Sequence, residues 1–91
     1  MSLGKVTIGI PFYNAEKYLQ DAILSVVNQT YKNWNLILLD DGSTDRSLEI
    51  AKTFANHKIS IVSDGENRGL VYRLNQLTEL ADGAFYSRMD A

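Results

Sequence analysis

The sequence contains no cysteine, one proline and one histidine. The absence of cysteine excludes a disulfide framework, a thiol nucleophile and a cysteine-based zinc site. The longest apolar runs, such as Leu36 to Leu39, are far shorter than the roughly 18–20 residues that a membrane-spanning helix requires. The chain does not open with the basic and then apolar segments of a signal peptide. We therefore expect a cytoplasmic protein, with any membrane association provided by regions outside this chain.

Neither sign of charge predominates in the sequence. Nine basic residues are scattered among eleven acidic ones, and the net charge is −2. This balance does not provide the basic stripe that is typical of nucleic-acid-binding proteins. The hydrophobic fraction of 45% and the length of 91 residues suit one small globular domain. We expect residues 1–4 to be a remnant of expression cloning and residues 5–91 to be the folded unit.

Short β-branched runs alternate with helical patterns along the chain. Strands are predicted at residues 6–10, where Pro11 ends the first strand, and at 35–40, 59–62 and 84–89. A first helix is predicted from a cap at Asn14 to about Val27. A second follows the turn at 42–45 and runs through Leu48, Ala51, Phe54 and Ala55; a third covers 70–81, with Leu70, Leu74, Leu77, Leu80 and Ala81 on its buried face.

This alternation predicts an α/β fold with right-handed crossovers. We expect a three-layer half-sheet of four parallel strands in the order 3-2-1-4, with helices on both faces. In such sheets, ligands bind outside the carboxyl ends of the strands, where the strand order reverses. The segments that fall there are 11–14, 40–43, 64–69 and Asp90, which are the most polar and turn-rich of the chain.

Asp40 and Asp41 end the apolar second strand and precede a glycine turn. A carboxylate at this position could accept hydrogen bonds from a nucleobase N–H group or from ribose hydroxyls. Alternatively, the two residues simply finish the strand, while Ser43 and Asp45 cap the next helix. The pattern alone leaves both interpretations open.

Two other strand ends carry candidate residues with a binding and a structural interpretation. Tyr13 follows the first strand and could stack on a planar base, or it could pack under its own loop. Asp90 follows the fourth strand and could bind a hard cation, or it could merely end the strand. One carboxylate is not a metal site, because such ions need several oxygen ligands.

The segment Asn67, Arg68 and Gly69 precedes the third predicted helix. The free N–H groups of that helix could face an anion. Arg68 or Arg73 could pair with a diphosphate, although solvation is the ordinary state of a surface arginine.

Together these segments resemble the family 2 glycosyltransferases, which have the GT-A fold. The resemblance covers essentially everything after Gly4 and rests on six stretches in order. They are VTIGIPFYN at 6–14, SVVNQTY at 25–31, DDGSTD at 40–45, NRGL at 67–70, LN at 74–75 and RMDA at 88–91. Each stretch is weak alone, and the set with these spacings is specific.

The resemblance implies an inverting transfer of a sugar from a nucleotide sugar, with UDP as the expected nucleotide, to a hydroxyl of a carbohydrate or glycolipid acceptor. Asp90 resembles the first acid of the family's D-x-D motif, whose acids hold the nucleotide and a divalent metal, Mn²⁺ or Mg²⁺, on the diphosphate. In the family, the residues matching Pro11 and Tyr13 line the nucleotide pocket, and the residue matching Asp41 holds the uracil or other base. We therefore expect the nucleotide-binding residues of this chain to be Pro11, Phe12, Tyr13, Asp40, Asp41, Asn67, Arg68 and Gly69.

The sequence lacks the later D-x-D acid and the downstream catalytic base of the family. We therefore expect a nucleotide-sugar-binding subdomain, truncated at the D-x-D motif and inactive by itself, whose exposed sheet edge could pair with a second copy. A non-catalytic module that binds a nucleotide or a protein partner is the alternative. A receiver-type signalling domain would need a phosphorylatable Asp after a third strand and a Lys after a fifth, and the sequence provides neither.

Overall fold

The computed structural model describes residues 5–81 and 85–87. Strands and helices alternate, so the predicted α/β class with a parallel sheet is confirmed. The elements in chain order are β1 (Val6–Phe12), α1 (Leu19–Val27), β2 (Trp34–Asp40), α2 (Ser47–Lys52), β3 (Ile59–Ser63), α3 (Leu70–Ala81) and β4 (Phe85–Ser87).

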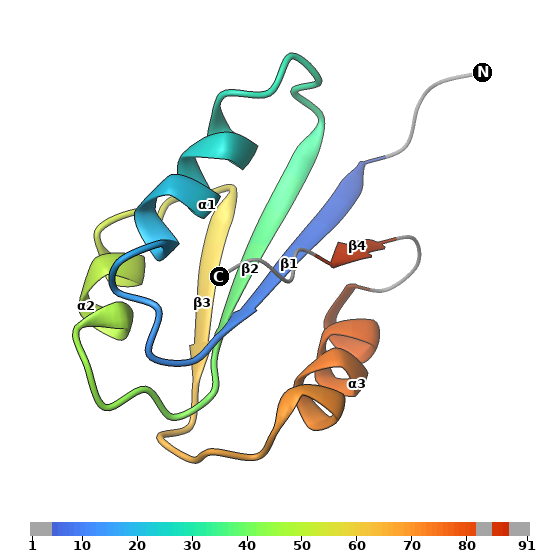
Figure 1. Ribbon diagram of the computed structural model, residues 1–91. Coiled ribbons are helices and arrows are strands. Elements are labelled where there is room, and N and C mark those ends of the chain that lie inside the picture. Colours follow the sequence, from blue (N-terminus) through green and yellow to red (C-terminus); the bar gives the residue numbers. More distant parts are fainter. Residues whose placement is uncertain (1–4, 82–84, 88–91) are drawn as a thin grey trace.

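The strands lie in the order β3-β2-β1-β4, and each neighbouring pair is parallel. Helices α1 and α2 cover one face of the sheet and α3 covers the other, as Figure 1 shows. The first two crossovers place β2 and then β3 on one side of β1, and the third, through α3, places β4 on its other side. The strand order therefore reverses between β1 and β4. The loop after β1 therefore borders the point where a doubly wound sheet binds its ligands, and the residues that follow β4 lie outside the described part of the chain.

Each face of the sheet has its own hydrophobic core. Alternate residues of β2 point to opposite faces, which explains why this strand is apolar along its length. Leu36 and Leu38 pack under α1 and α2, whereas Ile37 and Leu39 pack with Leu77 of α3. The continuous apolar run is thus the signature of a strand that is buried on both faces, as predicted.

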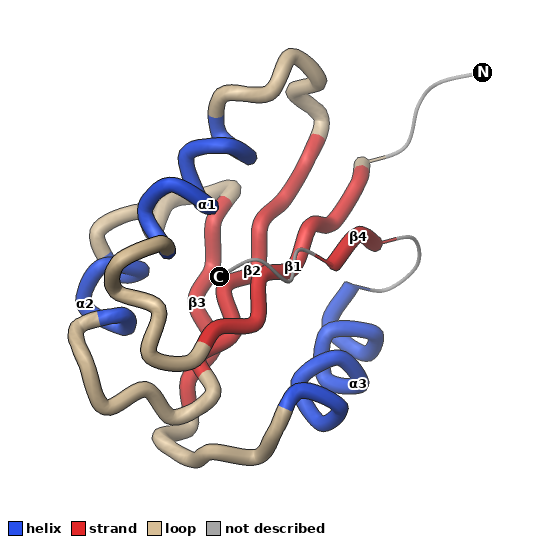
Figure 2. The backbone as a smooth tube through the Cα atoms, viewed as in Figure 1, coloured by secondary structure: helices blue, strands red, loops and turns tan. Residues whose placement is uncertain are grey.

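The register aligns the strand ends that carry the polar loops. Phe12 pairs with Asp40, and Asp40 pairs with Ser63, so β1, β2 and β3 end level with one another. The residues that follow these ends therefore leave the same edge of the sheet, and the loops gather there in Figure 2.

The sequence predicts that the first strand stops at Pro11, but the strand continues to Phe12. Pro11 pairs with Leu39 of β2. On its other side, β1 pairs with β4 only over Thr7–Gly9, among the residues that the structure describes. A proline removes one possible ladder hydrogen bond, yet β1 extends past it because its pairing with β2 continues to Phe12.

Both crossover helices on the first face are shorter than predicted. Asn14 does not cap α1, which begins at Leu19 after a turn, because Asn14 has a left-handed backbone with φ of 48° and bonds to another loop. α2 ends at Lys52, where the hydroxyl of Thr53 donates to the carbonyl of Ile50 at 2.6 Å.

The buried face of α3 also differs from the prediction. Leu70 and Leu80 are about half exposed, and the buried residues are Arg73, Leu77 and Ala81, spaced by four. This stripe packs closely on the sheet at Gly9, because glycine has no side chain to separate α3 from β1. Within the described residues, no helix has the length and apolar character needed to cross a membrane. The predicted fourth strand, 84–89, is described only over 85–87.

Candidate functional site

Three loops meet at the carboxyl edge of the sheet, and their backbones are joined directly. The N–H group of Asp41, just after β2, donates to the carbonyl of Phe12 at 2.8 Å. Gly42 has φ of 73°, and a Cβ atom there would lie 2.6 Å from the backbone nitrogen of Asn67. Only glycine fits this close approach, so the glycine turn allows the loop before α3 to pack on the loop after β2.

The carboxylate of Asp41 accepts hydrogen bonds from the start of α3. Its Oδ1 accepts from the backbone N–H groups of Arg68 at 2.8 Å and Gly69 at 3.2 Å, and from Nε of Arg73 at 2.9 Å. Among the described residues, only the N–H of Gly69 donates to its Oδ2, also at 3.2 Å. Asp41 therefore serves as the anion at the N-terminus of α3, a position that favours negative charge.

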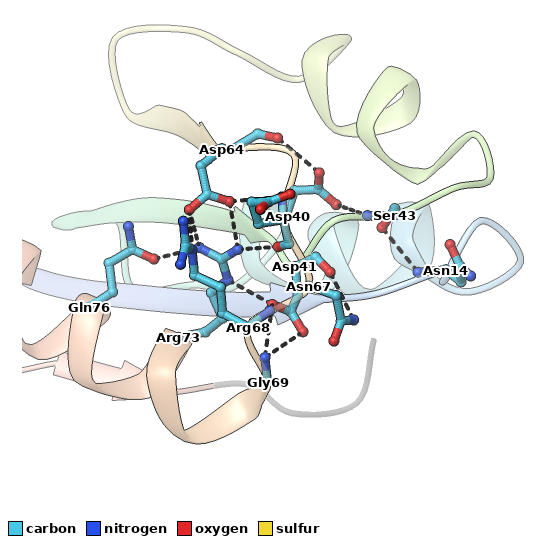
Figure 3. A network of polar contacts seen from close by, with 12 residues as sticks. Asn14, Asp40, Asp41, Ser43, Asp64, Asn67, Arg68, Gly69, Arg73 and Gln76 are labelled. Carbon is cyan, nitrogen blue, oxygen red and sulfur yellow. Dashed lines mark hydrogen bonds and ion pairs between the residues drawn. The ribbon is translucent and has the colours of Figure 1, made fainter.

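Arg73 is the centre of this network, as Figure 3 shows. Its side chain is 0% exposed, and all three nitrogens of the guanidinium have partners. Beyond the bond to Asp41, Nη2 donates to Asp64 Oδ1 at 2.9 Å and to the carbonyl of Glu66 at 2.6 Å. Nη1 donates to Gln76 at 2.9 Å and, at 3.4 Å, to Asp64. Arg73 thereby joins the ends of β2 and β3 to the first turns of α3.

The electrostatics follow from these contacts. Burial alone would raise the pKa of Asp41, but the bonds from the Arg68 backbone, Arg73 and Gly69 outweigh it and hold the pKa below its usual value. The guanidinium groups of Arg73 and Arg68 lower the pKa of Asp64 strongly. Burial of Arg73 would lower its pKa, yet the two carboxylates raise it, so this buried group stays charged.

We expect the stability of the fold to fall in acid because of this cluster. Asp41 and Asp64 have folded-state pKa values below the unfolded value of about 3.9. Their contribution is therefore complete above about pH 4 and is lost as the pH falls through the folded-state values. In urea unfolding, the stability difference between the parent chain and Asp64→Asn is expected to be largest near about pH 6 and to shrink below about pH 3.

Asp21→Asn is the matched control, because it removes an exposed carboxylate outside the cluster. A constant stability difference between the parent chain and Asp64→Asn across this pH range would contradict the expectation.

Asp40 lies beside Asp41 but has a different environment. It is 1% exposed. Its Oδ1 accepts from the backbone N–H of Ser43 at 3.0 Å, and its Oδ2 accepts from the hydroxyl of Ser63 at 2.9 Å. The carboxylate thus holds the glycine turn and links β2 to β3, which corresponds to the structural interpretation of this residue.

The loop after β1 is held by the loop after β2. The side-chain oxygen of Asn14 accepts from the backbone N–H groups of Thr44 at 2.7 Å and Asp45 at 3.2 Å, and the N–H of Asn14 donates to Ser43 Oγ at 3.0 Å. The N–H of Ala15 donates to the buried hydroxyl of Ser47 at 2.7 Å. This double attachment fixes the position of Tyr13, which is 47% exposed.

The structure brings most of the predicted binding residues to one place. Asp41, Asn67, Arg68 and Gly69 are in contact, since the amide of Asn67 also donates to the Asp41 carbonyl at 3.2 Å. Tyr13 reaches the surface, whereas the side chains of Pro11, Phe12 and Asp40 are buried. The side chain of Arg68 is 41% exposed and pairs with Asp64 at 2.8 Å.

The metal prediction falls on Asp90, which lies outside the described residues. Over residues 5–81 and 85–87, no group of three or more His, Cys, Asp or Glu side chains could hold a metal ion. The described residues alone therefore do not fit a metal site, and no chemical step is assigned to one here.

The sequence offered Arg73 as a partner of a diphosphate or as a solvated arginine, and both interpretations are wrong, because its side chain is 0% exposed and donates to protein groups. The contribution of Asp64 was not predicted. A signal was present, because residues 73, 77 and 81 form one stripe at helical spacing. An arginine on the same stripe as two apolar residues indicates a buried cation, and a buried cation requires carboxylate partners.

Sequence relatives of the chain are glycosyltransferases. EpsE of Bacillus subtilis, which is named as a glycosyltransferase, is 40% identical over 89 residues, covering 94% of this chain and 32% of EpsE. The UDP-Glc:alpha-D-GlcNAc-diphosphoundecaprenol beta-1,3-glucosyltransferase WfgD of Escherichia coli is 33% identical over 86 residues, covering 94% of this chain and 34% of WfgD. The chain thus spans about a third of the length of these two relatives.

A solved structure has the same fold as the described sheet and helices. It is the mannosyltransferase PcManGT from Pyrobaculum calidifontis, in complex with GDP-Man and Mn²⁺. The match has a TM-score of 0.77 and 23% identity, and it covers 88% of this chain and 25% of PcManGT. The arrangement of elements is therefore that of a GT-A glycosyltransferase.

The family model described as glycosyl transferase family 2 matches residues 7–91, which includes every loop of the site. The sequence relatives and the shared fold agree with this match. The chain belongs to glycosyl transferase family 2.

Proposed function

We propose that this chain is the nucleotide-binding part of an inverting glycosyltransferase that transfers a sugar from a UDP-linked donor to an acceptor hydroxyl. The observation that carries the proposal is the Asp41 carboxylate. Its side chain is 11% exposed at the edge of the sheet where the loops converge, and within the described part of the chain Oδ2 accepts a single bond, at 3.2 Å. A fixed carboxylate oxygen of this kind is a suitable acceptor for a nucleobase N–H group.

The surroundings of Asp41 fit a nucleotide. The Asp41–Phe12 backbone bond brings the carboxylate next to the loop that carries Tyr13, whose half-exposed ring offers a surface for base stacking. On the other side, the guanidinium of Arg68 is partly exposed and remains charged, which suits a phosphate group. A base and a diphosphate therefore each have a complementary group at this edge.

The relatives support the donor class. The name of WfgD states that it uses UDP-Glc, and the structure of PcManGT contains GDP-Man. We extend a nucleotide-sugar donor, with UDP as the nucleotide, to this chain by family membership. A carbohydrate or glycolipid acceptor, a divalent metal held with the help of Asp90, and a cytoplasmic location remain part of the proposal. We expect the 91-residue chain to bind the donor nucleotide without turnover, since its sequence contains no residue matching the family's catalytic base.

Substituting Asp41 tests the proposal. Asp41→Asn preserves the size of the side chain but replaces the carboxylate by an amide. We expect UDP binding to weaken by about 1–3 kcal/mol, the cost of a lost hydrogen bond to a charged group. Calorimetric titration with UDP measures this change, and circular dichroism verifies that the variant is folded.

Asp21→Asn serves again as control, because it changes the net charge equally on an exposed surface of α1. Equal UDP affinity in the folded Asp41→Asn variant and the parent chain would remove Asp41 from the site. No nucleotide binding by the folded parent chain would reject nucleotide binding by this chain as a whole.

A further inference from the structure

The two oxygens of the Asp41 carboxylate are not equivalent. A carboxylate oxygen accepts about two hydrogen bonds through its lone pairs. Oδ1 already accepts three, from the Arg68 and Gly69 backbones and from Arg73 Nε, at 2.8–3.2 Å. From residues 5–81 and 85–87, Oδ2 accepts one bond, at 3.2 Å, from an N–H group that it shares with Oδ1. Any further donor must therefore approach Oδ2.

The unequal hydrogen bonding of the two Asp41 oxygens depends on Arg73. The guanidinium cannot contact a ligand itself, because it is completely buried and its nitrogens donate to Asp41, Asp64, Gln76 and the Glu66 carbonyl. Because the guanidinium is planar and rigid, its Nε–H group stays directed at Oδ1 while its two Nη groups are bound at the end of β3 and in α3. The carboxylate can therefore neither rotate nor present Oδ1 without breaking several charged hydrogen bonds.

We propose that Arg73 is a positioning residue that leaves only Oδ2 of Asp41 for the nucleobase and thereby selects a base edge with one N–H donor over an edge with two adjacent donors. This inference rests on the proposed nucleotide binding. Uracil offers a single N–H between two carbonyl groups, which Oδ2 satisfies. Guanine offers a ring N–H beside an amino group, and such a pair is best matched by both oxygens of a carboxylate. With Oδ1 occupied, one guanine donor is left without its partner and must lose its water.

The test is a pair of calorimetric titrations of the full chain, with UDP and with GDP. The parent chain is expected to prefer UDP by about tenfold or more, the scale of one mismatched donor at a base edge. Arg73→Lys preserves the positive charge but not the planar set of N–H donors, so the Asp41 carboxylate is no longer held in one orientation. We expect the UDP-to-GDP affinity ratio to fall by about tenfold in this variant, because UDP binds more weakly while GDP gains access to Oδ1.

A second variant, Asp64→Asn, removes the carboxylate that pairs with the Nη groups of Arg73 and leaves every hydrogen-bond donor of Asp41 in place. We expect its affinity ratio to shift in the same direction by a smaller factor, and this variant decides the question if Arg73→Lys does not fold. Arg46→Lys is the matched control, because Arg46 is an exposed arginine paired with Glu49 far from the network in sequence and contacts. Its ratio is expected to equal that of the parent chain.

The outcomes separate the inference from the function on which it rests. Equal losses of UDP and GDP affinity in the folded variants would show that Arg73 only supports the fold, and would overturn the inference. Equal affinities of the parent chain for UDP and GDP would overturn it while leaving nucleotide binding intact. Binding of neither nucleotide by the folded parent chain would reject the proposed function and the inference together.

Discussion

Replacing Arg73 with methionine is expected to lower the free energy of unfolding by about 3–5 kcal/mol, the usual cost of removing one partner from a buried ion pair. The methionine fills much of the same space but donates no hydrogen bond. Asp41 keeps its backbone donors, whereas Asp64 retains only Arg68 and the backbone of Glu66. Because a small domain has a total stability of about 5–15 kcal/mol, this loss is a large part of it. Urea unfolding measures the change.

A double substitution distinguishes lost pairing from lost packing. Asp41→Asn removes the buried charge that Arg73→Met leaves without its side-chain partner. If the large cost arises from that charge, the double variant will be more stable than the sum of the two single costs predicts, by about 0.5–3 kcal/mol. Additive costs would instead assign the effect to the packing of the Arg73 stem against α3 and the sheet.

The fold could be predicted because its signals are local and repeated. The first three strand runs are rich in β-branched residues or continuously apolar, and the alternation of strands with helices leaves few topologies. The errors lie where a tertiary contact overrides a local preference. Asn14 has a side chain suited to a helix cap, but it caps the turn at Thr44 and Asp45, 30 and 31 residues away, instead of α1. A proline often ends a strand, but the pairing of β1 with β2 continues past Pro11 to Phe12.

The loops of the candidate site could be selected from the sequence, but the contacts within them could not. The rule that ligands bind at strand ends selected the loops that meet in the structure. The pattern could not show that Asp40 turns inward to Ser43 and Ser63 while its neighbour Asp41 faces the start of α3. Adjacent residues of a strand end point to opposite sides, and which side carries the ligand depends on where the later loop returns.

The second large effect is expected at the contact between α3 and the sheet. Leu77 is 0% exposed and packs with Ile37 and Leu39 of β2. Leu77→Ala should cost about 2–5 kcal/mol, the range for a leucine removed from a core that cannot collapse fully. Among the described residues, the buried members of this core are Ile37, Leu39 and Leu77, so few described side chains are available to fill the cavity. Urea unfolding and the thermal midpoint measure the loss, with Leu80→Ala, a half-exposed position on the same helix, as control.

Gly9 gives this prediction an internal check. A Cβ atom on Gly9 of β1 would overlap both methyl groups of Leu77 and lie 2.9 Å from its Cγ. Gly9→Ala alone should therefore destabilise the fold by about 1–3 kcal/mol, because the buried leucine has no space to move. In the Leu77→Ala background the same methyl group enters the cavity instead, so the double variant should be more stable than additivity predicts. Strict additivity would mean that α3 does not rest on Gly9. The stripe that places Arg73 beside Asp41 would then be held by other contacts.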